Sequence, residues 1–523
     1  MIGPAGTPAG AATFADQSLL VVDANGMVDA SGVTSFVALR GGGIGVPAAV
    51  LTVDNGAKLH IVGGMGGDVL TITNNFDDVA LDPIPNGWLG DNLSTSTGLL
   101  SAFGAFDAGG YSVSLVSNPA VSVFPLLSPS MGRLVDSVFS QTRINTDSQD
   151  AGVRFLSRAV SDGYIGRDDP RLAAATIEGA AQLAVVGAVP GVTLSALNAS
   201  TEAVTARTAF ASPLIDNSKA ASVSVDKDGK PSLAGLSAGN NMKNGLGLWI
   251  MPLYQNNHVW GMKAENFKTG YDSSLGGLAL GADFTVEEMF RIGVAFNAGG
   301  GYAKSSGDFN KTENDFQFWG AALYGGWTMH NFGLTADVGY TGTYNDLRQK
   351  LPASMQMREL KADVNSQAVT TGLRAEYKLE TPFLDIIPHA GARYTGLFID
   401  RYKVRREGTV FKVDQSQQDI WTFPVGLLVT KDFDTDTGWI FKPQVDLSVI
   451  PATGDLKARS RSRIPGMGHS ADLKTQVVDY LTWQGGAGFE LKGDNLSLGL
   501  GYTLQASEHR TGHGVFGTMR YDF

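Results

Sequence analysis

Residues 515–523 read VFGTMRYDF, and this stretch decides the fold class of the 523-residue chain. Apolar and polar side chains alternate in it, which is typical of a strand with one face in an apolar medium and one in water. The two faces hold these residues: Val515, Gly517, Met519, Tyr521 and Phe523 on one, and Phe516, Thr518, Arg520 and Asp522 on the other. Chain ends usually fray. A patterned strand that ends on an aromatic residue therefore predicts a strand that stops at a membrane interface.

The same alternation recurs in twelve strand-like segments between residues 245 and 523. Residues 496–505 show it best, because leucines and Tyr502 face one way while Gly, Ser, Thr and Gln face the other. Full charges stand at mid-strand on the polar faces, where we expect them to line a pore: Arg374, Glu376, Arg393 and Asp446. A soluble sandwich buries one face in a dry core, whereas a wide membrane barrel has a polar interior and an apolar exterior.

No segment reaches the roughly 20 apolar residues of a spanning helix, and only a closed barrel otherwise satisfies every backbone group in lipid. The predicted fold is therefore all-β dominated, with a twelve-stranded antiparallel transmembrane β-barrel over residues 245–523. A soluble all-β protein, such as a lectin-like sandwich, is the alternative that alternation alone leaves open.

The connections between these segments alternate in length. Turn-sized connections occupy residues 285–289, 330–331, 434–438 and 492–495, and long polar ones occupy residues 347–364, 403–418 and 454–478. Outer-membrane barrels have short periplasmic turns and long external loops. Aromatic residues near the strand ends are expected to form an interfacial girdle: Trp249, Tyr254, Trp260, Trp319, Trp327, Trp421, Trp439 and Trp483.

The composition narrows the function classes. A net charge of -11 argues against a nucleic-acid partner, and the absence of cysteine argues against a zinc site, a thiol enzyme and a disulfide scaffold. Charged residues make up 17% of the chain, below the roughly 25% of soluble proteins. We expect no cofactor and no metal.

Residues 128–244 are predicted to form a helical linker. Ser128 starts one helix, and Asp169 with Pro170 starts another. After a break at Pro190–Gly191, a helix of small residues follows at about 191–210, thin enough to lie inside a barrel. Its polar side chains would meet the polar wall: Asn198, Ser200 and Glu202. A helical linker packed on something else is the alternative.

The stretch IEGAAQLAVVGAVPGVTLSALNASTEAVTAR, residues 177–207, precedes a barrel that ends in YDF. Together they resemble the translocator domain of classical (type V) autotransporters, over residues 173–523. The resemblance implies an outer-membrane barrel that is monomeric, a helix in its pore, and a passenger that the barrel exports to the cell surface and anchors there. It also implies that the barrel-assembly machinery recognises the terminal strand through Phe523, Tyr521 and Met519. Some members of the family cleave their own chain between two asparagines of the pore helix. In this chain the pair Asn240–Asn241 lies in the connector before the first strand, so we expect a flexible loop there and no self-cleavage.

Residues 1–127 read as short strands with Gly and Asn turns, which predicts a β-helix-like passenger remnant. The segment Gly63–Thr71 matches one copy of a calcium-binding nonapeptide, but such sites take their ligands from stacked successive copies, so we expect a plain solenoid turn. In GDNLS, Asn92 stands where a serine-esterase motif has its nucleophile, so we expect no enzyme. The first residues lack the features of a secretory signal, which we expect to lie upstream.

Two further functions stay open at this stage. One is a porin or channel with a periplasmic N-terminal third, and the other is a surface adhesin that acts through the passenger and external loops. Basic residues in the third long connection are candidate contacts for lipopolysaccharide or a host-surface ligand: Lys457, Arg459, Arg461 and Arg463. A solvated loop face would have the same composition. Outer-membrane lipid is the expected surroundings of the barrel.

Overall fold

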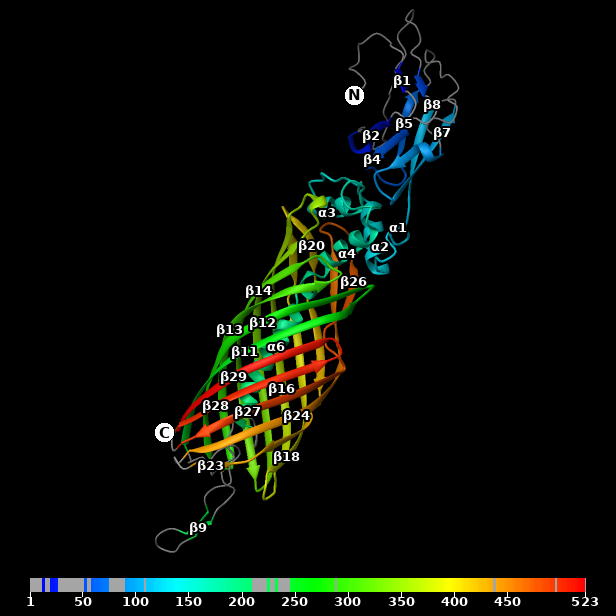
Figure 1. Cartoon of the computed structure of the whole chain (residues 1–523). Helices are drawn as coiled ribbons and strands as arrows, with labels where there is room; N and C mark the ends of the chain where they lie inside the picture. The colour runs from blue at the N-terminus through cyan, green and yellow to red at the C-terminus, as the bar shows by residue number, and fades with distance from the viewer. Residues whose placement is uncertain are drawn as a thin grey trace, which may run out of the picture.

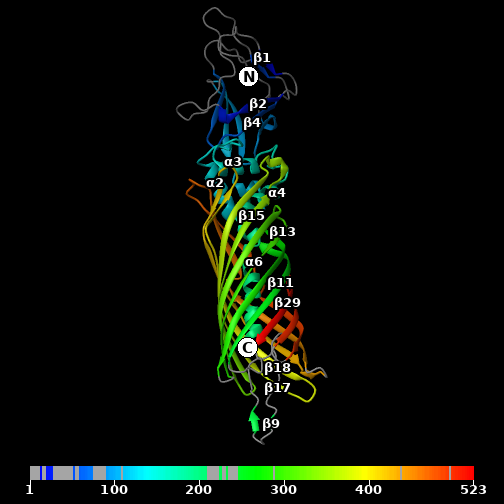
Figure 2. The ribbon, with the colours of Figure 1, turned by 90° about the vertical axis from the view of Figure 1, so that its left-hand side faces the viewer.

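The computed structural model describes residues 12–14, 19–26, 51–53, 58–74, 90–107, 110–208, 223–225, 231–233, 245–286, 289–435, 439–493 and 496–522. A β-barrel forms one end of an elongated molecule, the N-terminal strands lie beyond the other end, and helices lie between them (Figures 1 and 2). The fold therefore stacks three layers along one axis.

The barrel is a closed antiparallel ring in which the last strand pairs with the first. Its twelve spanning strands confirm the predicted fold. They are β11 (Gly245–Ala264), β12 (Phe267–Val286), β13 (Phe290–Gly307), β14 (Thr312–Met329), β15 (Phe332–Lys350), β16 (Glu359–Tyr377), β18 (Asp385–Ile399), β21 (Ser416–Thr422) continued by β22 (Val425–Thr430), β24 (Ile440–Gly454), β27 (Leu481–Lys492), β28 (Leu496–Ser507) and β29 (Arg510–Asp522). The two-residue strands β17 (Leu379–Glu380) and β23 (Phe433–Asp434) extend two of its turns.

Side chains alternate between the lipid face and the lumen along each strand, as β13 illustrates. Ile292 and Val294 are exposed on the outside, whereas Arg291 and Asn297 are buried on the inside. Of the predicted girdle, the exposed members are Tyr254, Trp260, Trp319, Trp421 and Trp483. Trp249 was wrongly assigned to it: the side chain is 6% exposed and its Nε1 donates to Tyr324 Oη in the lumen.

The segments predicted as long loops are mostly β-hairpins that extend the barrel wall outward. Residues 403–418 contain β19 (Tyr402–Arg405) and β20 (Thr409–Val413), and residues 454–478 contain β25 (Lys457–Arg463) and β26 (Ala471–Gln476). The predicted loop 347–364 is largely the ends of β15 and β16, around the 3-10 turn η3 (Ala353–Met355). Strand β19 pairs with β16, β20 with β25, and β26 with β11. A second closed ring results, made of β11–β16, β19, β20, β25 and β26, and its last contact is the pair Ala264↔Thr475. We call this ring the collar.

Helices occupy the space between the collar and the N-terminal strands, and one continues into the barrel. They are α1 (Ala120–Val123), α2 (Pro129–Phe139), α3 (Ala151–Val160), α4 (Pro170–Ala181), α5 (Leu183–Val186) and α6 (Val189–Thr208). The predicted caps are present: Ser128 accepts from Met131 N and Asp169 accepts from Leu172 N. Among the described helices, none has the length and apolar character needed to cross a membrane.

The helix break differs slightly from the prediction. It falls before Pro190, at Ala188, whose φ of 64° ends the right-handed helical path between α5 and α6. Pro190 instead lies in the first turn of α6, where its missing N–H leaves no hydrogen bond unmade. The pore helix therefore begins at Val189 rather than at residue 191.

The collar is lined with apolar side chains, unlike the polar lumen below it. Leu347, Phe411 and Leu473 point inward and belong to one apolar core with α2–α5. Collar strands contact residues 181–184 from several sides: Ser462 Oγ donates to Ala181 O, Thr475 Oγ1 donates to Gln182 Oε1, and Ala184 N donates to Tyr402 Oη. The chain therefore passes through the collar with apolar and hydrogen-bonded contacts around it.

The described N-terminal strands form small sheets that rest on the helices. β2 (Leu19–Asp23), β4 (Lys58–Val62) and β6 (Leu93–Thr95) pair in parallel, as do β1 (Ala12–Phe14) and β3 (Leu51–Val53), and such stacking is expected of a β-helix. In contrast, β5 (Val69–Asn74), β8 (Gly110–Ser117) and β7 (Leu100–Asp107) are antiparallel, which a regular solenoid is not. The short turns η1 (Ala24–Gly26) and η2 (Gly90–Asn92) and the pair β9 (Val223–Val225) and β10 (Pro231–Leu233) complete the described elements.

Candidate functional site in the barrel lumen

Helix α6 lies inside the barrel and packs against one side of its wall. It contacts β11–β16 closely and the rest of the ring much less. Small apolar side chains form the packed face: Val192, Ala196, Ala199 and Ala203. Gly191 allows the closest approach, since a Cβ there would be 1.9 Å from Tyr271 Oη. The small residues of α6 therefore let a helix and a wall share the lumen.

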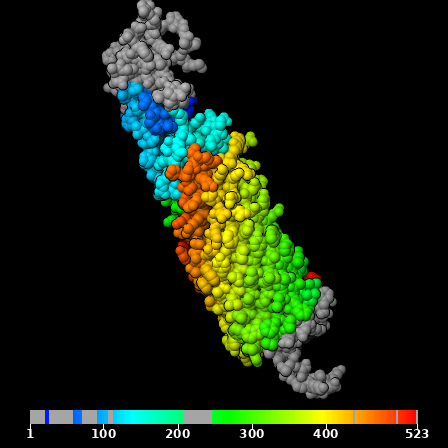
Figure 3. Space-filling view, turned by 180° about the vertical axis from the view of Figure 1, so that it is seen from behind, coloured from blue at the N-terminus to red at the C-terminus, as the bar shows by residue number. Residues whose placement is uncertain are grey.

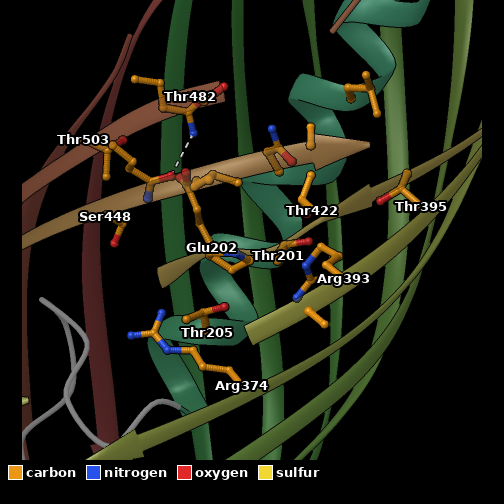
Figure 4. A pocket seen from close by; sticks show the side chains of 18 of the residues that line it. Thr201, Glu202, Thr205, Arg374, Arg393, Thr395, Thr422, Ser448, Thr482 and Thr503 are labelled. Carbon is orange, nitrogen blue, oxygen red and sulfur yellow. Dashed lines mark hydrogen bonds between the residues drawn. The ribbon is translucent and has the colours of Figure 1, made fainter. Parts of the chain in front are cut away.

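The opposite face of α6 borders a cavity of about 280 Å³. The helix residues at this cavity recur at helical spacing: Leu194, Asn198, Thr201, Glu202 and Thr205. Figure 4 shows Thr201, Glu202 and Thr205 in one space with Arg374 and Arg393 of the wall. Of the three pore-helix residues expected to meet polar walls, Asn198 and Glu202 thus face the cavity, whereas Ser200 is buried away from it.

Three of the four predicted pore-lining charges border this cavity, namely Arg374, Arg393 and Asp446. Glu376 is buried beside it, with Oε1 2.5 Å from Arg374 Nε. Arg393 donates to both oxygens of Asp337, at 2.8 and 2.7 Å. Cations and carboxylates are thus paired along the wall. The pairing compensates part of the free energy that these charges lose when the lumen shields them from water.

Two hydrogen-bond clusters fix α6 to the wall, and sequence reasoning missed both. Thr193 Oγ1 lies 3.0 Å from Thr343 Oγ1 and 2.6 Å from Ser366 Oγ. On the other side, Ser195 Oγ accepts from Asn257 Nδ2 at 3.3 Å. The partners lie more than 60 residues apart in the sequence, so no local pattern marks them.

The terminal-strand residues lie where β29 meets β11. Met519 is 52% exposed on the lipid face. The backbone of Tyr521 pairs with Leu248 on β11, its side chain lies outside the described part of the chain, and Phe523 lies outside it entirely. The lipid-facing side of the strand therefore agrees with the alternation on which the prediction rests.

Two carboxylates lie where a metal ion could bind, but each already forms ion pairs or hydrogen bonds with other residues of the chain. Asp68, in the calcium-like segment, forms a bidentate ion pair with Arg143. Asp479 lies near Glu508 and His509, and it accepts hydrogen bonds from Ser507 Oγ and from both the backbone N and Nδ1 of His509. Burial alone would raise the pKa of Asp479, but these hydrogen bonds lower it below its ordinary value. Both carboxylates therefore join segments of the fold.

A third carboxylate, Glu178 of α4, lies above the lumen where the helices enter the collar. Its Oε1 accepts from the backbone N of Ser128 at 2.5 Å, and its side chain is fully buried. Burial raises the pKa of Glu178 to about 7, against the smaller opposite effect of the Ser128 hydrogen bond. Glu178 therefore connects α4 to the start of α2 through a group that titrates near neutrality.

Comparison with known proteins agrees with this architecture. Residues 248–503 match the family model of the autotransporter beta-domain. No curated protein matches the chain.

Similar solved structures include three autotransporter domains of 14–16% identity, a level that speaks to the fold alone. The NalP translocator domain of Neisseria meningitidis has 14% identity and a TM-score of 0.39, with 54% of this chain and 90% of that chain covered. The transport unit of AIDA-I from Escherichia coli has 16% identity and a TM-score of 0.41, with 53% of this chain and 90% of that chain covered. The beta domain of BrkA from Bordetella has 15% identity and a TM-score of 0.40, with 53% of this chain and 99% of that chain covered.

The family match runs from β11 into β28, through most of the ring that surrounds α6, and the family is the autotransporter beta-domain. The barrel of this chain is therefore an autotransporter beta-domain, an outer-membrane translocator that exports the chain's own N-terminal passenger and anchors it at the cell surface.

Proposed function

We propose that, after export, this chain stays threaded through its own barrel, with α6 as a lasting plug and α2–α5 as a cap in the collar. The observation that carries the proposal is the continuity of the path. Residues 177–207 run through the collar into the lumen, and they contact the wall in both places. Residues N-terminal to α1 would then be displayed outside the membrane, as a passenger anchored through the helices.

The lumen contacts favour a plug over a transient passage. The hydroxyl groups of Thr193, Thr343 and Ser366 lie within 3.0 Å of one another, and Asn257 donates to Ser195. Each such hydrogen bond adds roughly 1 kcal/mol, and the alanine face adds apolar burial. These contacts argue against a porin, because a helix packed in the lumen reduces the cross-section through which solutes could diffuse.

The same architecture supports the division into three parts. Residues 1–127 would be the passenger remnant, residues 128–244 the linker with the pore helix, and residues 245–523 the anchor. We further propose that the barrel functions as a monomer, since its ring is closed by its own first and last strands. It would be inserted by the barrel-assembly machinery through the terminal strand, whose lipid face includes Met519. The exported segment acts by display rather than catalysis in this proposal.

Disulfide trapping tests the plug, because the chain has no native cysteine. The variant Thr193→Cys with Ser366→Cys, expressed with a secretory signal and an N-terminal tag in a Gram-negative host, should form a cross-link in intact cells. The matched pair Thr193→Cys with Ser448→Cys places the second thiol on β24, across the cavity, and should not. In both, protease added to intact cells should remove the tag.

The outcomes separate the possibilities. A surface-exposed tag with no Thr193–Ser366 cross-link would disprove the plug while leaving export intact. A tag that survives until the outer membrane is permeabilised would contradict display of the N-terminal segment at the surface.

A further inference from the structure

The outer face of the collar hairpins carries an excess of positive charge. On β19, β20, β25 and β26, buried side chains point toward the helices and the alternate residues point outward. The outward residues include eight cations. Two of them, Arg405 and Arg461, form ion pairs with Asp363 and Asp472. We call the other six the basic face: Lys403, Lys412, Lys457, Arg459, Arg463 and Lys474. The run predicted in a solvated loop is thus one strand of a larger sheet, in a chain whose net charge is -11.

Like charges stand directly opposite one another in this sheet. Lys403 pairs in register with Lys412, and Lys412 with Arg463, so that three cations form one row across three strands. One strand further, Arg459 is opposite Lys474. Directly opposed like charges destabilise a sheet unless an anion lies between them.

A neighbouring row of the same collar shows how the fold neutralises such charges elsewhere. Arg348, Lys361 and Arg405 also stand in register across β15, β16 and β19. Each has its own carboxylate, with N–O distances of 2.7 Å to Asp346, 3.1 Å to Glu359 and 3.7 Å to Asp363, respectively.

Five of the six cations of the basic face have no such ion pair among the described residues. Arg463 is 3.1 Å from Asp414, whereas no described carboxylate forms an ion pair with Lys403, Lys412, Lys457, Arg459 or Lys474. The contrast between the two rows leaves the cations of the second row available to an external anion.

The position of the face identifies the anion. The exposed ring of Trp421 marks the outer apolar boundary on β21, and Trp421 pairs with Thr453 on β24. Lys457 follows four residues later, at the start of β25 and so at most roughly 13 Å away. Figure 3 shows the hairpin strands side by side on one surface, directly below the helices. The face therefore rises from the boundary of the outer leaflet, where phosphorylated sugars of lipopolysaccharide surround the barrel.

We propose that the basic face binds the phosphate groups of lipopolysaccharide in the surrounding outer leaflet. Clustered cations beside a membrane each strengthen binding to anionic headgroups, and strands hold them at a fixed spacing. This interaction is separate from export, because the cations lie on the outside of the collar and the helices on its inside.

The test compares two triple variants of the full chain, folded in detergent. K403Q/K412Q/R459Q removes three cations of the basic face, and K304Q/K311Q/K350Q removes three exposed cations from the β13–β15 side of the barrel. Binding of phosphorylated rough lipopolysaccharide is measured at low and high salt. The first variant should bind at least about tenfold more weakly and with a smaller salt dependence, and the second within about twofold of the parent.

Two ligand controls complete the design. Lipopolysaccharide stripped of phosphate should bind the parent chain as weakly as the intact form binds the first variant. Equal losses in both variants, or binding that is insensitive to dephosphorylation, would overturn the proposal. Heparin that binds more tightly than lipopolysaccharide would overturn it in favour of a soluble sulfated glycan. Surface display of an N-terminal tag should be unchanged in both variants, which separates this result from the plug.

Discussion

Arg510 on the last barrel strand donates two hydrogen bonds to Asn257 Oδ1 on the first strand, at 3.1 and 2.5 Å. Asn257 uses its other end to donate to Ser195 Oγ of α6, at 3.3 Å. The amide therefore connects the seam of the barrel to the pore helix, so that closure of the ring and seating of the helix depend on the same side chain.

Substitutions of Asn257 should separate these two roles. Asn257→Leu removes both and leaves Arg510 without this acceptor, so we expect a loss of about 2–3 kcal/mol in the free energy of unfolding. Asn257→Asp keeps an acceptor for Arg510 but no donor to Ser195, and should lose about 1 kcal/mol or less. The temperature at which the folded band disappears in heat-modifiability gels reports the order. Equal losses in the two variants would show that the contact with Arg510 contributes nothing, and no loss in Asn257→Asp would show the same of the contact with α6.

Gly191→Ala should displace α6 from the wall. The new methyl group would overlap the phenol of Tyr271, and overpacking of this kind typically costs about 1–3 kcal/mol. Gly276→Ala on the same strand as Tyr271 is the control, since nothing lies within 4 Å of its new Cβ. Cross-linking between residues 193 and 366 should fall only in the first variant, and adding Tyr271→Ala should restore it. If Gly276→Ala lowered it equally, the close approach would not be the cause.

Thr193→Val should loosen the helix without changing its shape. The methyl group replaces a hydroxyl that lies near Thr343 and Ser366, which still have each other at 2.6 Å. The expected loss is about 1 kcal/mol. Hydrogen exchange of α6 amides should become faster in this variant, and Thr205→Val, on the cavity face of the same helix, should leave it unchanged. Unaltered exchange in Thr193→Val would contradict a role for the hydroxyl cluster.

The seating of α4 should weaken as pH rises. The pKa of Glu178 is raised from 4.5 to about 7 in the folded chain, so protonation favours the folded state. Stability from this group is complete below about pH 4.5 and is lost as the pH rises through about 7, by about 3 kcal/mol in total. Protection factors of the amides in residues 170–181, which correct for the intrinsic pH dependence of hydrogen exchange, should therefore be lower at pH 8 than at pH 5. Glu178→Gln should abolish the difference, and persistence of the difference would assign it to another group.

Strand alternation was readable where lipid and lumen impose opposite demands on neighbouring residues. In β28 the leucines meet lipid and the Gly, Ser and Thr residues meet the lumen, so the sequence pattern and the physical surroundings coincide. Helix starts at Ser128 and Asp169 were also predictable, because a cap depends on residues within one turn.

The collar was not predictable from the same signals. On β25 the buried residues are Ala458, Ser460 and Ser462, which do not read as an apolar face, because the helices supply most of the apolar surface. The prediction that Trp249 belongs to the interfacial girdle was wrong for a related reason. Its neighbours Leu248 and Ile250 face lipid while Trp249 and Met251 face the lumen, so both faces of this segment are apolar and alternation is lost. Contacts such as Thr193 with Ser366 depend on which side of the lumen the helix takes, and that is set by the whole ring.

The collar has fewer strands than the barrel beneath it, and the diameter of a closed sheet falls with strand number. The chain that passes through it has the cap helices on one side and the pore helix on the other. Ring and chain are thus mechanically interlocked. The hairpins that complete the ring, around β19–β20 and β25–β26, must register after the chain has passed through. Withdrawal then requires either the cap helices to unfold or the ring to unpair at a contact such as Ala264 with Thr475, so the rate of detachment is set by an unfolding event.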